Sequence, residues 1–324
     1  MNDLSAPSVS VILPILNEES DLENCITAIL QQDYDGELEV ILALGPSKDS
    51  TDLIAQKIAA KDKRVKLVKN PTGLTAAGLN LAIKASSFEI ICRIDGHAEI
   101  SKTYIKSAVS IMKETGAVNV GGIMFADSDQ GLQRTVARAM RSKLGVGPSK
   151  FHTGGGAGES ETVYLGTFKK SAILAAGGFD ERFIRAQDWE LNYRIRKQGG
   201  LIWFDPRLVV TYRPRKTFSK LARQYFQYGR WRRVITRTHS NTSSLRYLAP
   251  PFAVVVNLFS LVSGVFVTPL LLLPLMVYIF TIVIGGFMIG RKITDKLLMP
   301  LVLATMHMSW GLGFITSPKN LLKG

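Results

Sequence analysis

The sequence contains an uninterrupted stretch, residues 247–290, in which none of the 44 side chains is charged. A helix needs about 20 apolar residues to cross the hydrocarbon core of a bilayer, so this stretch is long enough for two crossings. Pro269 and Pro274 lie near its middle, where a helical hairpin would turn. The stretch therefore predicts two membrane helices, over about 248–268 and 271–290.

A third apolar run covers residues 297–316, after a short polar loop. It is weaker, because it contains His307, Ser309 and three residues that disfavour a regular helix: Pro300, Gly311 and Gly313. We therefore predict two to three transmembrane helices within residues 247–317. The alternative is a buried helical core of a soluble protein, but so long an uncharged stretch exceeds what such a core usually contains.

The net charge of +14 is concentrated in one segment directly before the apolar tail. Residues 1–206 contain 24 basic and 25 acidic side chains, whereas residues 207–246 contain 11 basic side chains and no acidic one. A basic segment beside a membrane helix favours anionic lipid headgroups as its partner. The charge distribution therefore argues against nucleic acid as a partner and predicts a membrane-interface segment over 207–246.

The cellular location is predicted from the amino terminus and the cysteines. Residues 1–4 lack the basic start and apolar core of a signal peptide, so we expect residues 1–246 on the cytoplasmic side of the inner membrane. Cys25 and Cys92 can form neither a disulfide framework nor a Cys/His zinc cluster, which favours a reducing compartment.

Residues 1–206 alternate between short β-rich runs and helical segments, which is typical of a parallel or mixed sheet with crossover helices. The predicted strands are 8–13, 38–44, 65–69, 89–94, 118–122 and 201–204. The predicted helices are 19–31, 51–60, 74–85, 102–114 and 188–198. Ligands of such sheets bind at the carboxyl ends of the strands, so the residues that follow each strand are the candidates for function.

Five short motifs occur at or after these positions. They are Pro14-Ile15-Leu16-Asn17-Glu18, Asp95-Gly96-His97, Gly177-Gly178-Phe179-Asp180-Glu181, Gln187-Asp188-Trp189-Glu190 and Gln227-Tyr228-Gly229-Arg230-Trp231. In this order the chain resembles the family 2 glycosyltransferases with the GT-A fold, and in particular membrane-anchored bacterial exopolysaccharide enzymes of the succinoglycan glucosyltransferase type. The resemblance covers about residues 8–235. It implies a Rossmann-like GT-A domain with a mixed, mostly parallel sheet over residues 1–206.

The resemblance also implies which residues bind the nucleotide-sugar donor: Pro14, Asn17, Glu18, Asp49 and Asp95. The family usually has an acidic pair after the second strand, and that carboxylate reads the nucleotide base. This chain has Leu44 and Gly45 there, although Asp49 and Thr51 follow as in the family. The departure argues against UDP as the donor nucleotide, although backbone groups of Leu44 and Gly45 could still meet the base.

Asp95 and His97 are the candidate metal ligands. One residue separates them at a strand end, so both side chains should point to the same side. A divalent ion held there would bridge the donor diphosphate and neutralise charge on the leaving group. Most of the family has a second carboxylate in place of His97, and an imidazole shifts the preference from Mg²⁺ toward Mn²⁺. The alternative is an ordinary strand-to-helix turn.

Asp188 is the candidate general base. Inverting displacement of a nucleoside diphosphate needs one carboxylate near the acceptor hydroxyl, and in the family this is the Asp of a Glu-Asp pair. Here the preceding residue is Gln187. Glu190 and Asp180 are rival candidates, and Asp188 could also cap the helix that it starts.

Residues 216–238 are predicted to form an amphipathic helix that is both basic and aromatic and lies in the headgroup plane. The resemblance implies that Gln227, Arg230 and Trp231 serve the acceptor and diphosphate end of the site. Arg230 could bind a phosphate while Trp231 stacks on a sugar ring. The alternative is a lipid-facing anchor without a catalytic share. His152, in a glycine-rich loop over 147–158, could close over donor or acceptor, or be an ordinary loop residue.

These observations predict a membrane-anchored, metal-dependent, inverting glycosyltransferase. Its partners would be a nucleotide-sugar donor, a lipid-linked or cell-envelope saccharide acceptor, and membrane lipids, with Mn²⁺ or Mg²⁺ as cofactor. The alternatives among enzymes are a polyprenyl-phosphate sugar synthase and a processive polysaccharide synthase, although a processive enzyme usually has more membrane helices. A non-catalytic membrane scaffold with a degenerate nucleotide site is the alternative outside enzymes, and Asp95 and Asp188 argue against it.

Overall fold

The computed structural model describes residues 6–239, 242 and 244–322, and these form two compact units. The first unit combines Met1–Met124 with Gly154–Tyr212, and the second combines Phe125–Thr153 with Arg213–Gly324. The segment 125–153, which the sequence analysis had counted with the first domain, thus belongs to the C-terminal unit. Residues 1–4, on which the expected lack of a signal peptide rests, lie outside the described residues.

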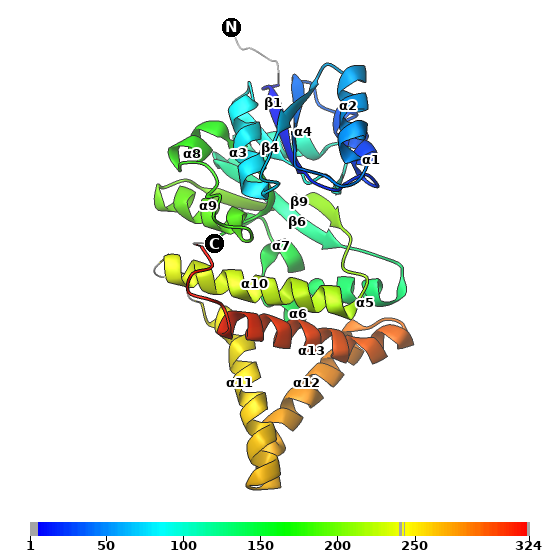
Figure 1. Cartoon of the computed structure of the whole chain (residues 1–324), viewed down its shortest axis with the longest axis vertical. Helices are drawn as coiled ribbons and strands as arrows, with labels where there is room; N and C mark the ends of the chain where they lie inside the picture. The colour runs from blue at the N-terminus through cyan, green and yellow to red at the C-terminus, as the bar shows by residue number, and fades with distance from the viewer. Residues whose placement is uncertain (1–5, 240–241, 243, 323–324) are drawn as a thin grey trace. The chain divides into compact units, whose positions relative to one another are not determined.

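The first unit is built on a nine-stranded sheet with the order β3-β2-β1-β4-β8-β6-β9-β5, and β7 pairs with β9. Its strands β1, β4, β6 and β9 are labelled in Figure 1. Strands β3, β2, β1 and β4 pair in parallel, whereas the pairs that involve β5, β7 and β8 are antiparallel. The strands are β1 (Val9–Ile15), β2 (Leu38–Leu44), β3 (Val65–Lys69), β4 (Ile90–Arg93), β5 (Glu99–Ile100), β6 (Asn119–Ala126), β7 (Gly158–Glu159), β8 (Tyr164–Lys169) and β9 (Ile202–Tyr212). The predicted mixed α/β fold class is confirmed.

The helices of the first unit follow the strands along the chain. They are α1 (Leu22–Leu30), α2 (Thr51–Lys61), α3 (Thr75–Ala85), α4 (Tyr104–Thr115), α8 (Lys170–Ala175) and α9 (Gln187–Lys197). Strand β1 is buried at every position except Pro14, as expected for a central parallel strand covered on both faces. Helix α1 buries Leu22, Cys25, Ile26 and Ile29, a spacing that places all four on one helical face. The core therefore holds the carboxyl ends of β1, β2 and β4 in fixed register.

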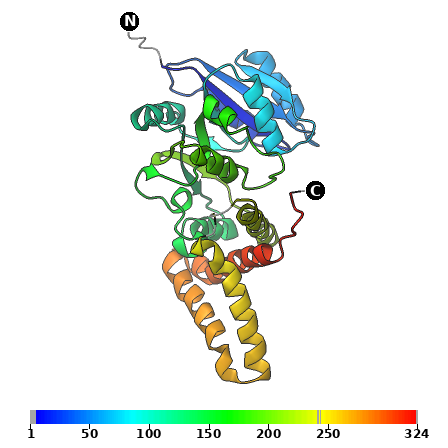
Figure 2. The ribbon, with the colours of Figure 1, turned by 90° about the vertical axis from the view of Figure 1, so that its left-hand side faces the viewer.

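The second unit is helical. Its helices are α5 (Gly131–Met140), α6 (Lys143–Val146), α7 (Lys150–Thr153), α10 (Phe218–Thr238), α11 (Leu245–Phe266), the 3-10 turn η1 (Pro269–Leu272), α12 (Leu273–Ile289) and α13 (Ile293–Ile315). Three of its segments are long and apolar enough to cross a membrane: Leu245–Phe266, Pro269–Ile289 and Ile293–Ile315. Helices α11 and α12 lie side by side as a hairpin in both views (Figures 1 and 2).

The structure differs from the predicted elements mainly around β8 and β9. Strand β8 lies between β4 and β6 but was not predicted. Gly166 interrupts its apolar pattern, and two lysines follow Phe168. Strand β9 continues to Tyr212, because Leu208 and Val210 keep alternating into the core. A domain boundary after residue 206 would therefore cut this strand.

Candidate active site

The loops that follow β1 and β2 are tied together by side chains from the first motif. Asn17 adopts a left-handed backbone conformation with φ of 56°, which turns its side chain toward the second loop. Its Oδ1 accepts a hydrogen bond from the backbone N–H of Lys48 at 2.8 Å, and its own N–H donates to Ser47 Oγ at 3.1 Å. Asn17 therefore fixes the shape of the donor-side loops, next to Pro14 at the end of β1.

Asp49, expected at the donor, lies just before α2 and forms hydrogen bonds to its first residue, Thr51. Its Oδ1 accepts from the backbone N–H of Thr51 at 3.1 Å and from the Thr51 hydroxyl at 2.5 Å. The same hydroxyl oxygen accepts from the N–H of Glu18 at 2.7 Å. Asp49 and Glu18 are thus linked through Thr51, which makes loop positioning the observed role of Asp49.

The backbone groups expected to meet the nucleotide base already have protein partners. The N–H of Gly45 donates to the Ile15 carbonyl at 2.8 Å, and the Leu44 carbonyl accepts from the N–H of Asn70 at 2.7 Å. These bonds extend the ladders between neighbouring strands. One backbone group of each residue is therefore engaged in the sheet, and a contact of Leu44 or Gly45 with the base stays a prediction.

Asp95 and His97 lie beyond the strand rather than on it. Strand β4 ends at Arg93, and residues 95–98 form a turn in which the N–H of Ala98 donates to the Asp95 carbonyl at 2.9 Å. The two-residue alternation of a strand does not apply in a turn, so the predicted reason for their common direction is wrong. Their partners decide what each side chain can do.

His97 pairs with Glu18 through Nδ1, which lies 2.9 Å from Glu18 Oε1. This hydrogen bond raises the pKa of His97 and fixes the ring, leaving Nε2 as its second nitrogen. An imidazole held by a carboxylate in this way is typical of histidines that bind metal ions.

The donor set fits a divalent ion that is shared with a substrate. Among the described residues, no group of three or more His, Cys, Asp or Glu side chains is placed to hold a metal ion. Asp95 and His97 supply one carboxylate and one imidazole nitrogen, so the other ligands would have to come from diphosphate oxygens and water. Mg²⁺ and Mn²⁺ sites in nucleotide enzymes are commonly completed in this way.

Arg93, which the sequence analysis did not single out, connects Asp95 with Asp188. Its Nη2 lies 2.9 Å from Asp95 Oδ1, and its Nη1 forms an ion pair with Asp188 Oδ1. Only 5% of the Arg93 side chain is exposed, compared with 23% for Asp95 and 31% for Asp188. One buried cation thus forms ion pairs with two carboxylates that remain partly exposed to solvent.

Asp188 lies in the first turn of α9, after Ala186, whose φ is 61°. The N-cap of this helix is Ala186, and among the described residues no side chain caps it, so the alternative capping role of Asp188 is not observed. Partial burial and the negative charge of Asp95 raise the pKa of Asp188, while the charge of Arg93 acts in the opposite direction. A carboxylate with a raised pKa is better suited to accept a proton near neutral pH.

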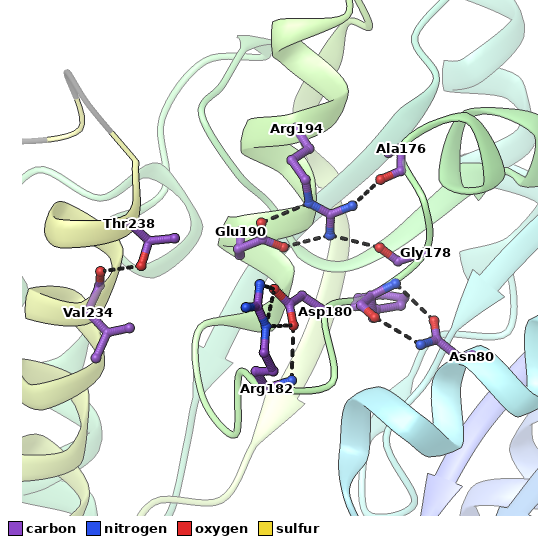
Figure 3. Close-up of polar contacts among 10 residues, drawn as sticks. Asn80, Ala176, Gly178, Asp180, Arg182, Glu190, Arg194, Val234 and Thr238 are labelled. Carbon is purple, nitrogen blue, oxygen red and sulfur yellow. Dashed lines mark hydrogen bonds and ion pairs between the residues drawn. The ribbon is translucent and has the colours of Figure 1, made fainter. Parts of the chain in front are cut away.

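The two rival bases, Glu190 and Asp180, are engaged in other ion pairs (Figure 3). Arg194 donates to both carboxylate oxygens of Glu190, at 2.8 and 2.6 Å, and to the backbone carbonyls of Ala176 and Gly178. Arg182 binds Asp180 in the same two-pronged way and lowers its pKa. Both carboxylates therefore hold loop structure, which leaves Asp188 as the best-placed base.

The loop that carries Asp180 is attached to α3 by one amide side chain. Asn80 accepts from the N–H of Phe179 at 2.9 Å and donates to the Phe179 carbonyl at 2.9 Å (Figure 3). It also donates to Glu181 at 3.0 Å. The side-chain amide of Asn80 thus pairs with both backbone groups of Phe179, as a neighbouring strand would. The glycine-rich motif, which connects α8 with α9, is therefore held against α3 by hydrogen bonds.

The residues expected at the acceptor end lie on α10, in the second unit. Gln227 and Arg230 are partly exposed, and the Arg230 guanidinium lies 5.7 Å from the centre of the Phe226 ring. Trp231 is only 3% exposed, so the expected stacking of its ring on a sugar is wrong for this arrangement. Its ring packs in the interior because it falls on the buried face of α10, with Leu221, Tyr225, Val234 and Ile235.

His152 lies in the short helix α7 rather than in an open loop. Burial lowers its pKa to about 4, so its ring is neutral at physiological pH. Its ring lies 4.3 Å from that of Phe151, measured between ring centres.

Arg93 and Glu18 thus act differently from what the motifs indicated. Arg93 interrupts an otherwise apolar strand, Ile90-Ile91-Cys92-Arg93-Ile94, and a charge in a buried strand needs an opposite charge close by. That signal was present in the sequence. The contact of Glu18 with His97 spans 79 positions and had no comparable signal.

Comparison with known proteins shows which proteins the chain is similar to. The sequence profile of glycosyl transferase family 2 matches residues 10–172. The succinoglycan biosynthesis protein ExoA of Rhizobium meliloti (strain 1021) is 30% identical over 317 residues, which cover 97% of this chain and 96% of that protein.

Two further comparisons cover nearly the whole chain. A dolichyl N-acetyl-alpha-D-glucosaminyl phosphate 3-beta-D-2,3-diacetamido-2,3-dideoxy-beta-D-glucuronosyltransferase of Methanococcus voltae is 26% identical over 98% of both proteins. The solved mannosyltransferase PcManGT from Pyrobaculum calidifontis, in complex with GDP-Man and Mn²⁺, has a TM-score of 0.61 and 18% identity over 96% of this chain and 87% of that chain. The second likeness supports the GT-A-like fold.

Proposed function

Because the chain belongs to glycosyl transferase family 2, we propose that it is a membrane-anchored, metal-dependent, inverting enzyme. It moves a sugar from a nucleotide-sugar donor to a lipid-linked or cell-envelope saccharide. Membership of this family, whose relatives take part in polysaccharide and lipid-linked sugar biosynthesis, favours an enzyme over the membrane scaffold. The observation that carries the proposal is the placement of Asp188 beside Asp95 by the buried cation Arg93.

The reaction is a single displacement at the anomeric carbon. The acceptor hydroxyl oxygen forms the new bond to this carbon as the bond to the diphosphate oxygen breaks, and the hydroxyl proton passes to Asp188. Arg93 holds the Asp188 carboxylate in one orientation, which leaves Oδ2 to accept the proton. Attack from the face opposite the leaving group inverts the anomeric configuration.

The diphosphate end of the donor would be bound at Asp95 and His97. These two residues would hold a divalent ion, and Glu18 would keep the His97 ring in place. When bound, the ion neutralises negative charge on the departing diphosphate. The imidazole favours Mn²⁺ over Mg²⁺, and the Pyrobaculum calidifontis protein of similar fold was solved with Mn²⁺.

The nucleotide would be bound by the loops after β1 and β2, which Asn17, Asp49 and Thr51 hold together. The carboxylate that reads uracil in the family is replaced by Leu44 and Gly45. A nucleotide other than UDP is therefore part of the proposal. The GDP-Man complex of the Pyrobaculum calidifontis protein makes guanosine the first alternative to test.

The acceptor would reach the enzyme from the membrane surface. Helix α10 is amphipathic and basic, and the three apolar segments of the same unit anchor the chain on the cytoplasmic face of the inner membrane. Arg230 and Gln227, which are partly exposed on α10, would bind a phosphate of the acceptor or donor. The Methanococcus voltae relative, which is named for a dolichyl phosphate sugar, supports a lipid-linked acceptor.

A donor screen tests this function. The full-length protein in lipid nanodiscs is incubated with UDP-, GDP-, ADP- and CMP-sugars, with Mn²⁺, Mg²⁺ or EDTA, and release of the free nucleotide is measured. We expect turnover of at least one donor, fastest with Mn²⁺ and absent in EDTA. Equal turnover with EDTA, or none with any donor when a lipid extract supplies acceptors, would contradict the proposal.

A further inference from the structure

Helix α13 packs along α10 rather than away from it. A Cβ added at Gly229 of α10 would lie 1.9 Å from the carbonyl oxygen of Trp310, and one added at Gly313 would lie 2.0 Å from that of Phe226. Ser317, just beyond α13, donates to the Arg230 carbonyl at 3.0 Å. The two helices lie side by side in both views (Figures 1 and 2). Their backbones are in contact at Gly229 and Gly313, where a larger side chain would not fit.

Helix α10 cannot lie in the hydrocarbon of a bilayer. It carries six cations: Lys220, Arg223, Arg230, Arg232, Arg233 and Arg237. A charged side chain at the centre of a bilayer is unfavourable even on the lowest insertion scales, and six of them add up. A helix in backbone contact with α10 must lie at the same depth, so α13 is also at the membrane surface.

The start of α13 is fixed at the surface by a buried ion cluster within the second unit. Asp295 is fully buried, and its carboxylate lies 2.9 Å from Arg134 Nε and 3.3 Å from Arg138 Nε, both on α5. The opposite side of α13 presents an exposed apolar stripe made of Ile293, Leu297, Leu301, Leu312 and Ile315. A helix with one side on protein and the other apolar and unpartnered fits the plane of a lipid leaflet.

The hairpin of α11 and α12 projects only a short way past α13. Gly311 of α13 meets α11 at Pro250 and Val254, and His307 meets α12 at Tyr278, whose hydroxyl lies 3.2 Å from Nδ1. From Val254 to the end of α11 at Phe266, a helix rises about 18 Å. This is less than the hydrocarbon thickness of about 30 Å.

The tip of the hairpin is apolar. Phe266, Val267 and Leu270 are 82%, 75% and 75% exposed, and no residue between Tyr247 and Gly290 is charged. The charges nearest to the apolar part of the hairpin all lie at its base: Arg246 in the first turn of α11, and Arg291 and Lys292 after α12. Exposing such a tip to water would be unfavourable, whereas hydrocarbon accommodates it.

We propose that the chain enters the bilayer as a re-entrant hairpin, α11 with α12, whose tip ends inside the hydrocarbon, while α13 lies flat on the same leaflet. Both ends of the chain then lie on one side of the membrane. The inference rests on the membrane anchoring proposed above. It goes further by assigning the membrane-facing surface: the exposed stripe of α13 and the hairpin, with one leaflet as partner. Three crossing helices would instead place the two ends on opposite sides.

Cysteine labelling in oriented membrane vesicles tests this arrangement. The two native thiols should not react with maleimide. Cys25 and Cys92 are 4% and 0% exposed, and burial raises their pKa to about 12 and about 11. Single cysteines are introduced at three exposed positions: Gln56→Cys on α2, Thr268→Cys at the hairpin tip and Asn320→Cys after α13. Each variant is treated with a membrane-impermeant and a membrane-permeant maleimide, in inside-out and in right-side-out vesicles.

We expect Gln56→Cys and Asn320→Cys to be labelled by the impermeant reagent in the same vesicle orientation and to lose that labelling in the other. Thr268→Cys should be labelled only by the permeant reagent. Labelling of Asn320→Cys from the side opposite to Gln56→Cys would overturn the flat placement of α13. Labelling of Thr268→Cys by the impermeant reagent from either side would overturn the re-entrant tip.

Donor turnover by the same vesicles separates this inference from the proposed function. Each variant is assayed with the donor found in the screen. A variant that turns over this donor at the wild-type rate is folded. Absence of turnover in the wild type, with same-side labelling, would contradict only the proposed function. Turnover together with opposite-side labelling would contradict only the re-entrant arrangement.

Discussion

Arg93 and Asp188 form an ion pair between side chains that are 95 positions apart in the sequence. The same guanidinium donates to Asp95 at 2.9 Å, so one cation compensates two carboxylates. We expect Arg93→Met to lower the free energy of unfolding by about 3–5 kcal/mol, because it leaves two partly buried charges without a partner. Arg93→Lys keeps the charge and should recover most of this stability. Thermal unfolding of the full chain measures both, and an unchanged midpoint in Arg93→Met would contradict the pairing.

The raised pKa of Asp188 predicts the acid side of the pH profile. Asp188 must be unprotonated to accept a proton, so the transfer rate should fall as the pH drops through its pKa, which lies above the ordinary value of 3.8. Loss of the positive charge in Arg93→Met raises this pKa further, so the acid limb should move to higher pH. The measurement is kcat against pH for the wild type and Arg93→Met. A limb at the same pH in both would show that another group accepts the proton.

His97 and Glu18 predict how the enzyme selects its metal ion. His97→Ala removes the nitrogen ligand, so the preference for Mn²⁺ over Mg²⁺ should weaken and the metal concentration for half-maximal turnover should rise. Glu18→Gln removes only the charge that orients the His97 ring. It should lower the affinity for the metal ion by roughly 10–100-fold. Titration of turnover with each metal after treatment with EDTA measures this. Identical titration curves for His97→Ala and the wild type would exclude His97 as a ligand.

Asp295 predicts the stability of the second unit. Asp295→Ala leaves Arg134 and Arg138 buried without their shared carboxylate, and removal of one partner of a buried ion pair costs about 3–5 kcal/mol. Asp129→Ala, at an exposed acid next to α5, is the matched control and should cost less than about 1 kcal/mol. Chemical unfolding in detergent compares the two variants. Equal losses would show that the cluster does not hold α13 in place.

The first four strands could be predicted from the sequence because their signals are local. Strands β2 and β3 match the predicted bounds, since each is a short run rich in β-branched and aliphatic residues between polar segments. Strand β8 could not be predicted in the same way, because its position between β4 and β6 comes from pairing with distant strands. The assignment of residues 125–153 to the second unit has the same cause: Arg134 on α5 finds its partner 161 positions away.

The sequence predicted which residues belong to the candidate site, but it did not predict the contacts between them. The motifs identified Asp95, His97 and Asp188, but Arg93 and Glu18 gained their roles only when the loops after β1, β4 and the start of α9 came together. Trp231 was expected to be open to a sugar, since aromatic residues are common in sugar sites. The helical spacing of α10 places it on the buried face instead.

Sugar transfer by Asp188→Asn, measured beside donor binding, tests the central claim most directly. The substitution keeps the shape of the side chain but cannot accept the proton, so transfer should fall by ~10²-fold or more while affinity for the donor stays within a few-fold of the wild type. Asp180→Asn, which alters a carboxylate that Arg182 already holds, should transfer at close to the wild-type rate. Wild-type transfer by Asp188→Asn, or a loss of transfer in Asp180→Asn of the same size, would contradict the assignment of Asp188 as the base.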